Sequence, residues 1–194
     1  MLASRSTPTG DAAMSTKPLA AVFAALIAGQ PALAEVGAFA SPPVTLEGFG
    51  VICEVQLQGT RPAPDTLSGL LNLVDQDRPI DVETLQVPAE LGLSFGIRSS
   101  LTAGSAVPQV TVVVTHPPMG PNGVTVERWP TPMNFGETSL NLFTFEHEYE
   151  LAEGAWMFQL ERDGEVLLQQ PFQVTAPGTV PAVQQACFAA EIMS

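Results

Sequence analysis

Two cysteines are the residues of this chain with the clearest potential for chemistry. Cys53 lies on the apolar side of an alternating segment, and Cys187 lies near the C-terminal end. In an oxidising compartment an isolated pair of cysteines is usually bridged, whereas two unrelated buried thiols are the alternative. The sequence contains no C-x-x-C pair, so neither a redox nor a zinc role is indicated. We therefore predict a disulfide between Cys53 and Cys187.

The two histidines are the next candidates, as metal ligands. His116 precedes two prolines, which favours a loop position, and His147 lies between Phe145 and Tyr149, which favours a core or interface position. No fixed spacing joins either histidine to a second ligand, as a metal site would require. We predict no metal at these residues.

Acidic residues between 75 and 83 carry the oxygen ligands that calcium prefers. Asp75, Asp77, Asp81 and Glu83 alternate in pairs along this loop. The loop lacks the turn glycine and the fixed ligand spacing of an EF-hand. Whether the segment Asp75–Asp81 binds calcium therefore stays open at this point.

Carboxylates are also the candidates for catalysis. Glu146, Glu148 and Glu150 alternate, and about 7 Å would separate neighbours on one strand face. Such spacing suits two-carboxylate hydrolysis, but alternating acids more often form a solvated sheet face. The chain has no G-x-S-x-G motif and no phosphate-binding glycine loop. We predict no catalytic residue and no cofactor.

The N-terminal residues have the pattern of a targeting segment. From Met14 the chain has one lysine, an apolar stretch over residues 19–28, and the small residues Ala32 and Ala34 of an A-x-A site. This pattern is typical of a cleavable signal peptide, and the apolar stretch is shorter than the roughly 20 residues that cross a bilayer. We expect translation from Met1 or Met14, cleavage after Ala34, export to the periplasm and no membrane span thereafter. A retained anchor or a buried helix is the alternative.

The charge balance restricts the partners. The 194 residues include 20 acidic and 7 basic side chains, for a formal net charge of −13, and no lysine follows residue 34. Because nucleic-acid affinity depends on cationic contacts with phosphates, this composition argues against nucleic-acid binding. The charge favours solubility in the exported compartment, and an acidic binding surface is the alternative.

Alternating apolar residues predict a chain of short strands. Residues 49–57 alternate, 59–66 form a turn-rich break, and two short strands flank the acidic loop. Residues 109–115 are β-branched, as in a central strand, and 116–123 are expected to end it. Residues 124–129 and 140–151 alternate again, and Asp163-Gly164 predicts a hairpin between 156–160 and 165–174. Residues 182–192 are expected to form a short terminal helix.

These elements predict an all-β fold. Strands joined by frequent turns are typical of an immunoglobulin-like antiparallel β-sandwich, here with a short C-terminal tail. The expected organisation is an extension and signal peptide over 1–34, an extended lead-in over 35–47, the sandwich over 48–176 and the tail over 177–194. A glycine turn leads into Trp156 at the position of a tyrosine corner, where tryptophan lacks the hydroxyl of that motif.

Several segments together carry a family resemblance. They are Gly48-Phe49-Gly50, Gly92-x-x-Phe95-Gly96, His116-Pro117-Pro118, Glu150-Leu151-x-x-Gly154-x-Trp156-x-Phe158 and Pro171-Phe172-Gln173-Val174. Over about residues 48–175 the chain resembles a family of exported bacterial proteins, the domain of unknown function 3859. The resemblance implies an immunoglobulin-like sandwich and implies no activity.

The function that these observations favour is a non-catalytic binding or interaction module of the periplasm, with a protein or envelope partner that the sequence does not identify. The candidate contact surface is a proline-rich loop region: His116, Pro117, Pro118, Met119, Trp129 and Met133. Turn and core positions are the alternative for these six residues. A hydrolase acting on envelope carbohydrate, or a structural envelope protein, is the alternative function.

Overall fold

The computed structural model describes residues 37–102, 105 and 109–189, and the expected leader lies outside these residues. The chain divides into two units, 1–34 and 35–194, and every described residue belongs to the second. The elements in chain order are β1 (Phe39–Ala40), β2 (Val44–Ile52), β3 (Leu57–Pro62), β4 (Leu70–Val74), β5 (Gln86–Pro88), β6 (Ser94–Leu101), β7 (Gln109–Met119), β8 (Val124–Pro132), β9 (Thr138–Thr144), the 3-10 turn η1 (Glu148–Glu150), β10 (Gly154–Arg162), β11 (Glu165–Thr175) and α1 (Pro181–Cys187).

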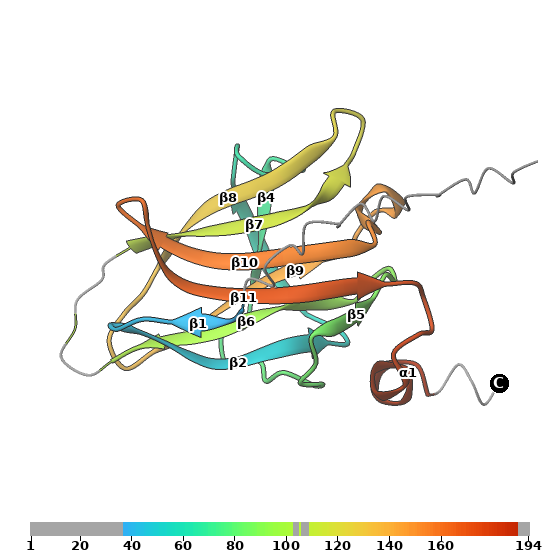
Figure 1. Cartoon of the computed structure of the whole chain (residues 1–194), viewed down its shortest axis with the longest axis horizontal. Helices are drawn as coiled ribbons and strands as arrows, with labels where there is room; N and C mark the ends of the chain where they lie inside the picture. The colour runs from blue at the N-terminus through green and yellow to red at the C-terminus, as the bar shows by residue number, and fades with distance from the viewer. Residues whose placement is uncertain (1–36, 103–104, 106–108, 190–194) are drawn as a thin grey trace, which may run out of the picture. The chain divides into compact units, whose positions relative to one another are not determined.

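The strands form an all-β sandwich of two main sheets. One sheet has the order β1-β11-β10-β7-β8, with β5 also pairing with β11, and the other has the order β2-β6-β9. Apart from the parallel pair of β5 and β11, neighbouring strands are antiparallel. Figure 1 shows the larger sheet lying over the smaller one. The predicted all-β sandwich is confirmed.

Aromatic residues fill the interior between the sheets. Phe95 of β6 is fully buried and lies within 5.3–6.1 Å, ring centre to ring centre, of five other aromatic rings. Three of these rings, Trp156, Phe158 and Phe172, belong to β10 and β11 of the opposite sheet. The alternation that placed these side chains on one strand face therefore produces the main contact between the sheets.

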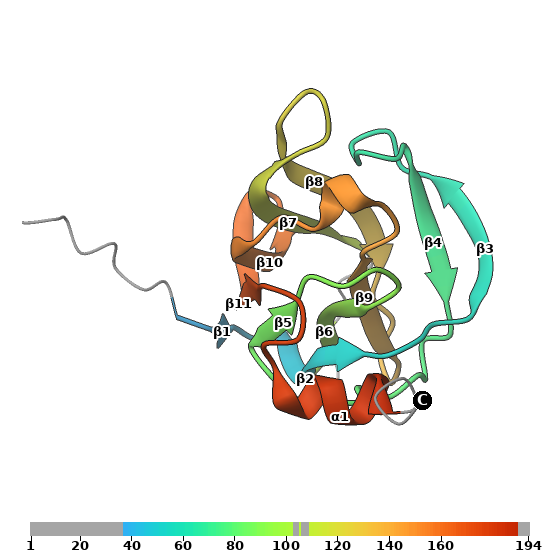
Figure 2. The ribbon, with the colours of Figure 1, turned by 90° about the vertical axis from the view of Figure 1, so that its right-hand side faces the viewer.

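A third, two-stranded sheet stands beside the sandwich. β3 and β4 pair with each other alone, so they form a hairpin outside both main sheets. Figure 2 shows this hairpin alongside β8 and β9, the strands that end the two main sheets on the same side. We call it the side hairpin. Residues 59–62 belong to β3, so the predicted turn-rich break over 59–66 is wrong at these positions.

Three further boundaries differ from the sequence prediction. β2 begins at Val44, so part of the expected lead-in over 35–47 is strand. β7 continues through Pro117 and Pro118 to Met119, and its register against β8 shifts beyond Thr115 because proline has no N–H to donate. β9 ends at Thr144, before the predicted end of its strand at 151.

The predicted hairpin is confirmed, and a terminal helix forms over Pro181–Cys187, the first part of the predicted span 182–192. Asp163 and Gly164 both have positive φ, 51° and 84°, as the tight turn between β10 and β11 requires. α1 packs through Val183, which is fully buried.

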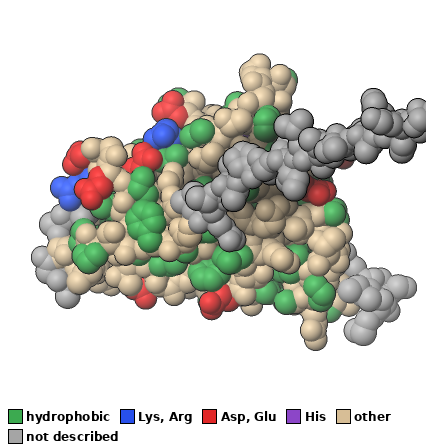
Figure 3. Space-filling model, in the orientation of Figure 1, with side chains coloured by type: hydrophobic (Ala, Val, Ile, Leu, Met, Phe, Trp, Pro, Cys, Tyr) green, Lys and Arg blue, Asp and Glu red, His purple; other side chains and the backbone are tan. Residues whose placement is uncertain are grey.

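In the face shown in Figure 3, charged side chains gather at the end of the sheet where β10 turns into β11. Within the described residues, no helix has the length and apolar character needed to cross a membrane.

Candidate functional site

A groove of about 620 Å³ lies between the side hairpin and the end strands of the two main sheets. β4 lines it from the hairpin, and β8 and β9 line it from the sandwich. Leu71 of the hairpin and Ala63 next to it pack against the apolar core, and polar contacts add to this attachment. Arg61 donates to the carbonyl of Pro130, the backbone carbonyl of Asp65 accepts the N–H of Arg128 at 3.0 Å, and Asn72 donates to Glu146 at 2.9 Å.

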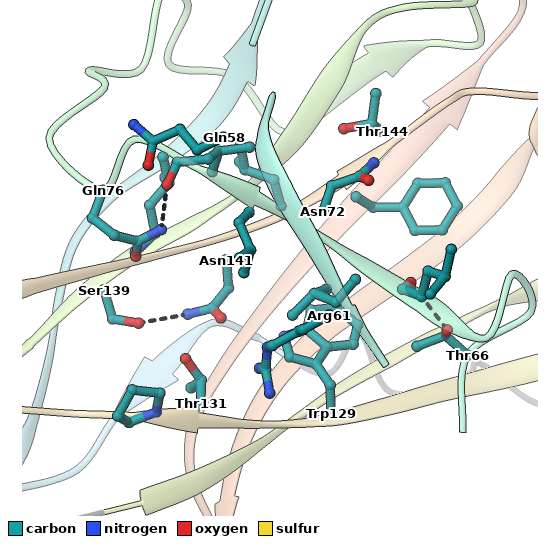
Figure 4. A pocket seen from close by; sticks show the side chains of 18 of the residues that line it. Gln58, Arg61, Thr66, Asn72, Gln76, Trp129, Thr131, Ser139, Asn141 and Thr144 are labelled. Carbon is teal, nitrogen blue, oxygen red and sulfur yellow. Dashed lines mark hydrogen bonds between the residues drawn. The ribbon is translucent and has the colours of Figure 1, made fainter. Parts of the chain in front are cut away.

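Polar side chains line the wall that the sandwich contributes. Thr131 of β8 and Ser139 and Asn141 of β9 alternate with outward-facing residues, so they share the inner face with Trp129 and Phe143. All three are buried, and Asn141 is only 4% exposed. The amide of Asn141 donates to the hydroxyl of Ser139 at 3.0 Å (Figure 4). We call Thr131, Ser139 and Asn141 the polar row.

Two buried carboxylates lie at one end of the groove. Glu127 of β8 is 6% exposed and accepts the N–H of Leu67 at 2.8 Å. Burial raises the pKa of Glu127, the Leu67 N–H partly opposes that rise, and the charge of Glu150 adds to it. Glu150 is itself buried and accepts the N–H groups of Glu146 and His147 at 2.6 and 2.9 Å. Both carboxylates thus hold backbone segments together while facing the groove.

Replacing Glu127 with glutamine is expected to stabilise the protein near neutral pH. The amide oxygen of the new side chain still accepts the Leu67 N–H, and the cost of burying a charge disappears, so we expect a gain on the order of 1 kcal/mol in urea unfolding. The raised pKa means that the native state holds this proton above pH 4.5, where the unfolded chain has lost it. The advantage of Glu127→Gln therefore grows as the pH rises through the folded-state pKa and vanishes below about pH 4.5.

The matched change Glu165→Gln, at an exposed position, should leave stability within about 0.5 kcal/mol at every pH, and an equal response of the two variants would contradict the prediction.

The edge of β9 faces the groove with unpaired backbone groups. The N–H of Leu140 donates to the side-chain oxygen of Gln76 at 2.9 Å, so the backbone of Leu140 points away from β6. Because this direction alternates along an antiparallel strand, Thr138, Leu142 and Thr144 point the same way. In the part of the chain that the structure describes, the backbone of Leu142 has no hydrogen-bond partner.

The predicted contact surface is not an exposed loop. His116 and Met119 lie in β7, Trp129 in β8 and Met133 just beyond it, and each is at most 4% exposed. Pro117 is half-buried and Pro118 exposed. Four of the six residues are therefore core residues, which was the alternative interpretation. The reason is that β7 continues through Pro117 and Pro118 instead of ending before them. Trp129 and Met133 nevertheless line the groove from its buried side.

Both histidines differ from their predicted environments: His116, expected in a loop, is buried, and His147, expected in the core or an interface, is exposed. His116 is buried with its ring centre 4.8 Å from that of Trp156, and burial lowers its pKa despite the bond to the Pro117 carbonyl. His147 is exposed and stacks on Tyr149 at the surface. The predicted face of Phe145, His147 and Tyr149 holds for Phe145, which is buried beside Phe143, and is wrong at His147 and Tyr149, because the strand has ended and η1 follows.

The acidic candidates are also redistributed. Glu146 and Glu148 are exposed and Glu150 is buried, so the three do not share one solvated sheet face. In the acidic loop, both oxygens of Asp81 accept from the guanidinium of Arg78, at 2.9 and 2.6 Å, and one also accepts the N–H of Cys53. The described residues contain no cluster of three metal-ligating side chains.

The cysteine pair lies where the sequence predicts. The sulfur atoms of Cys53 and Cys187 are 2.04 Å apart, which is a disulfide distance and attaches α1 to the end of β2. Trp156 occupies the position of a tyrosine corner, and its indole N–H donates to the backbone carbonyl of Ala152 at 2.9 Å. The indole thus makes a bond to backbone in place of the missing tyrosine hydroxyl.

Sequence reasoning missed the polar row, the β9 edge and the side hairpin. The polar row could have been found from the alternation of inward-facing and outward-facing residues along β9. Ser139 and Asn141 continue the inward phase of Phe143, so polar residues occupy positions where a sandwich interior should be apolar. The hairpin gave no such signal, because Leu57, Leu70 and Leu73 are exposed and its apolar pattern does not follow burial.

Comparison with known proteins gives a family. No curated protein matches the chain. Among solved structures, the chain is similar to an immunoglobulin-like protein from Pseudomonas aeruginosa, with 19% identity over 71% of this chain and 100% of that chain and a TM-score of 0.43. The family model described as domain of unknown function (DUF3859) matches residues 41–174, which is more than half of the chain. The protein therefore belongs to the DUF3859 family.

Proposed function

We propose that this protein is an exported, non-catalytic binding module whose ligand lies in the groove between the side hairpin and the sandwich. The observation that carries the proposal is the polar row. Thr131, Ser139 and Asn141 are buried on the inner face of the sandwich, where apolar side chains would stabilise the fold more. Polar groups kept at such positions are typical of ligand sites, where function is maintained at some cost in stability.

Export is supported by two features. The signal-peptide pattern over residues 14–34 gives the route, and the disulfide pair suits an oxidising compartment such as the periplasm.

Binding is favoured over catalysis by the state of the two buried carboxylates. Glu127 and Glu150 each accept backbone N–H groups from segments that they hold in place. An acid-base pair for hydrolysis would instead direct its oxygens at the substrate. A hydrolase remains the second candidate, because the pKa of Glu127 is raised and Glu150 adds to that rise.

The test is a paired replacement in the polar row. Ser139→Ala with Asn141→Leu removes both partners of one hydrogen bond, so no buried group is left unpaired and the fold should be unchanged or more stable. The wild type and this variant would be screened for binding by NMR shift mapping against a random peptide library and a panel of soluble cell-wall oligosaccharides. We expect compounds that shift groove residues of the wild type and bind the variant at least about tenfold more weakly.

Two outcomes would contradict the proposed function. One is that the variant loses stability by about 2 kcal/mol or more, which would make the row a structural network. The other is that no compound of either panel shifts groove residues. Hydrolysis of an oligosaccharide by the wild type would establish the second candidate instead.

A further inference from the structure

The end strands of the two sheets differ in how well their edges are protected. β8 is blocked in three ways. Pro130 and Pro132 have no N–H, Arg61 donates to the carbonyl of Pro130, and the backbone carbonyl of Asp65 accepts the N–H of Arg128. On the far side of the smaller sheet, Val51 of β2 exchanges backbone hydrogen bonds with Val82.

β9 has no comparable protection. Its seven residues carry no proline, and four of them direct their backbone toward the groove. β1 and β5, which pair with the outer side of β11, are only two and three residues long. β9 is therefore a seven-residue edge that contains no proline and that, among the described strands, pairs only with β6. Unprotected edges of this kind are the usual docking places for an added strand.

Side chains occupy the place of a missing strand next to β9. Gln76 presents an amide oxygen to the N–H of Leu140, as the carbonyl of a neighbouring strand would. Asn72 makes a second bridge, to Glu146. Residues 72 to 76 thus run in the opposite direction to residues 140 to 146, with side-chain amides between them. Two strands bridged in this way lie farther apart than the ~4.8 Å of paired strands.

The groove is lined by more acidic than basic side chains, and none of its glutamates forms an ion pair among the described residues. Glu127, Glu137, Glu146 and Glu150 line it, and each accepts hydrogen bonds from neutral groups. The ion pairs of the described residues involve other acids, namely Asp81, Glu161 and Asp163. Arg61 is the one basic residue in the described lining. A ligand with positive charge would therefore gain from entering this groove.

We propose that the occupant of the groove is an extended polypeptide segment bearing lysine or arginine side chains, which adds to β9 as a further strand of the smaller sheet. A peptide carbonyl replaces Gln76 at the N–H of Leu140, and the backbone of Leu142 gains its partner. The basic side chains of the segment face the groove glutamates. This inference rests on the proposed function and names its ligand class.

A polypeptide fits these features better than an oligosaccharide does. A neutral sugar would leave the β9 backbone without a matched ladder of partners and would not use the uncompensated glutamates. Aromatic stacking, on which many sugar sites rely, gains no platform from Trp129, because this side chain is 3% exposed.

The test uses one position with two substitutions. Leu142→Pro removes the outward N–H without touching the ladder to β6, whereas Leu142→Ala removes the side chain and keeps the N–H. The probes are decapeptides selected on the wild-type protein from a random phage-displayed library and then synthesised. We expect enrichment of lysine and arginine, at least about tenfold weaker binding to Leu142→Pro, and binding to Leu142→Ala within about threefold of wild type.

A second measurement keeps the inference testable if Leu142→Pro fails to fold. Peptides N-methylated at every second residue lose the N–H groups of one strand edge. Methylation of the residues whose N–H groups face β9 should abolish binding, and methylation of the alternate residues should not. Selected peptides that are acidic, that tolerate both phases, or that bind Leu142→Pro as well as wild type would overturn the inference. Groove binding by the oligosaccharide panel alone would overturn it too, while leaving the proposed function intact.

Discussion

Reducing the disulfide is expected to lower the stability of the folded protein by about 4 kcal/mol. Cys53 and Cys187 are 134 residues apart, and closing so long a loop removes much of the conformational freedom of the unfolded chain. The same bond attaches α1, whose Val183 is fully buried, to the end of β2. Urea unfolding of the oxidised protein, with and without reductant, measures the effect.

The double variant Cys53→Ala with Cys187→Ala is the control for reagent effects, and it should unfold at the same urea concentration as the reduced wild type. Equal midpoints for oxidised and reduced protein would contradict the prediction. Equal midpoints would mean that attaching α1 to the sandwich adds little to the free energy of unfolding.

Phe95→Ala is expected to destabilise the protein by about 3–5 kcal/mol. The ring is fully buried and contacts aromatic rings from both sheets, so its removal leaves a cavity at the point where the sheets meet. Edge-to-face pairs with Trp156, Phe158 and Phe172 add to the loss beyond the area buried. Urea unfolding followed by tryptophan fluorescence measures this change.

Phe135→Ala is the matched control, because the same side chain is removed from a position that is 61% exposed. We expect its stability to stay within about 0.5 kcal/mol of wild type. A loss below about 1.5 kcal/mol in Phe95→Ala would show that the interior can close around the cavity, and would contradict the role assigned to this ring.

The fold was largely predictable because the interior obeys strand periodicity. Phe95, Trp156, Phe158 and Phe172 lie in segments where apolar side chains recur at alternate positions or in β-branched runs, and the Asp163-Gly164 turn follows from backbone preference alone. The disulfide could be predicted from compartment and count, without geometry.

The errors arose where tertiary contacts override local preference. Prolines 117 and 118 predict the end of a strand, yet burial of His116 and Met119 on either side keeps β7 extended. The side hairpin depends on hydrogen bonds to residues about 60 positions away, such as Leu67 to Glu127, and no local pattern encodes these. The candidate site was missed for the same reason, since it lies between this hairpin and the edge of β9.

The central claim is that β9 receives an added strand in this groove, and amide hydrogen exchange of β9 tests it most directly. With a selected basic peptide bound, the amide of Leu142 should change from fast to slow exchange, while the amide of Phe143, already paired toward β6, should change little. Slowed exchange confined to other strands, or an unchanged rate at Leu142 in the saturated complex, would contradict the claim.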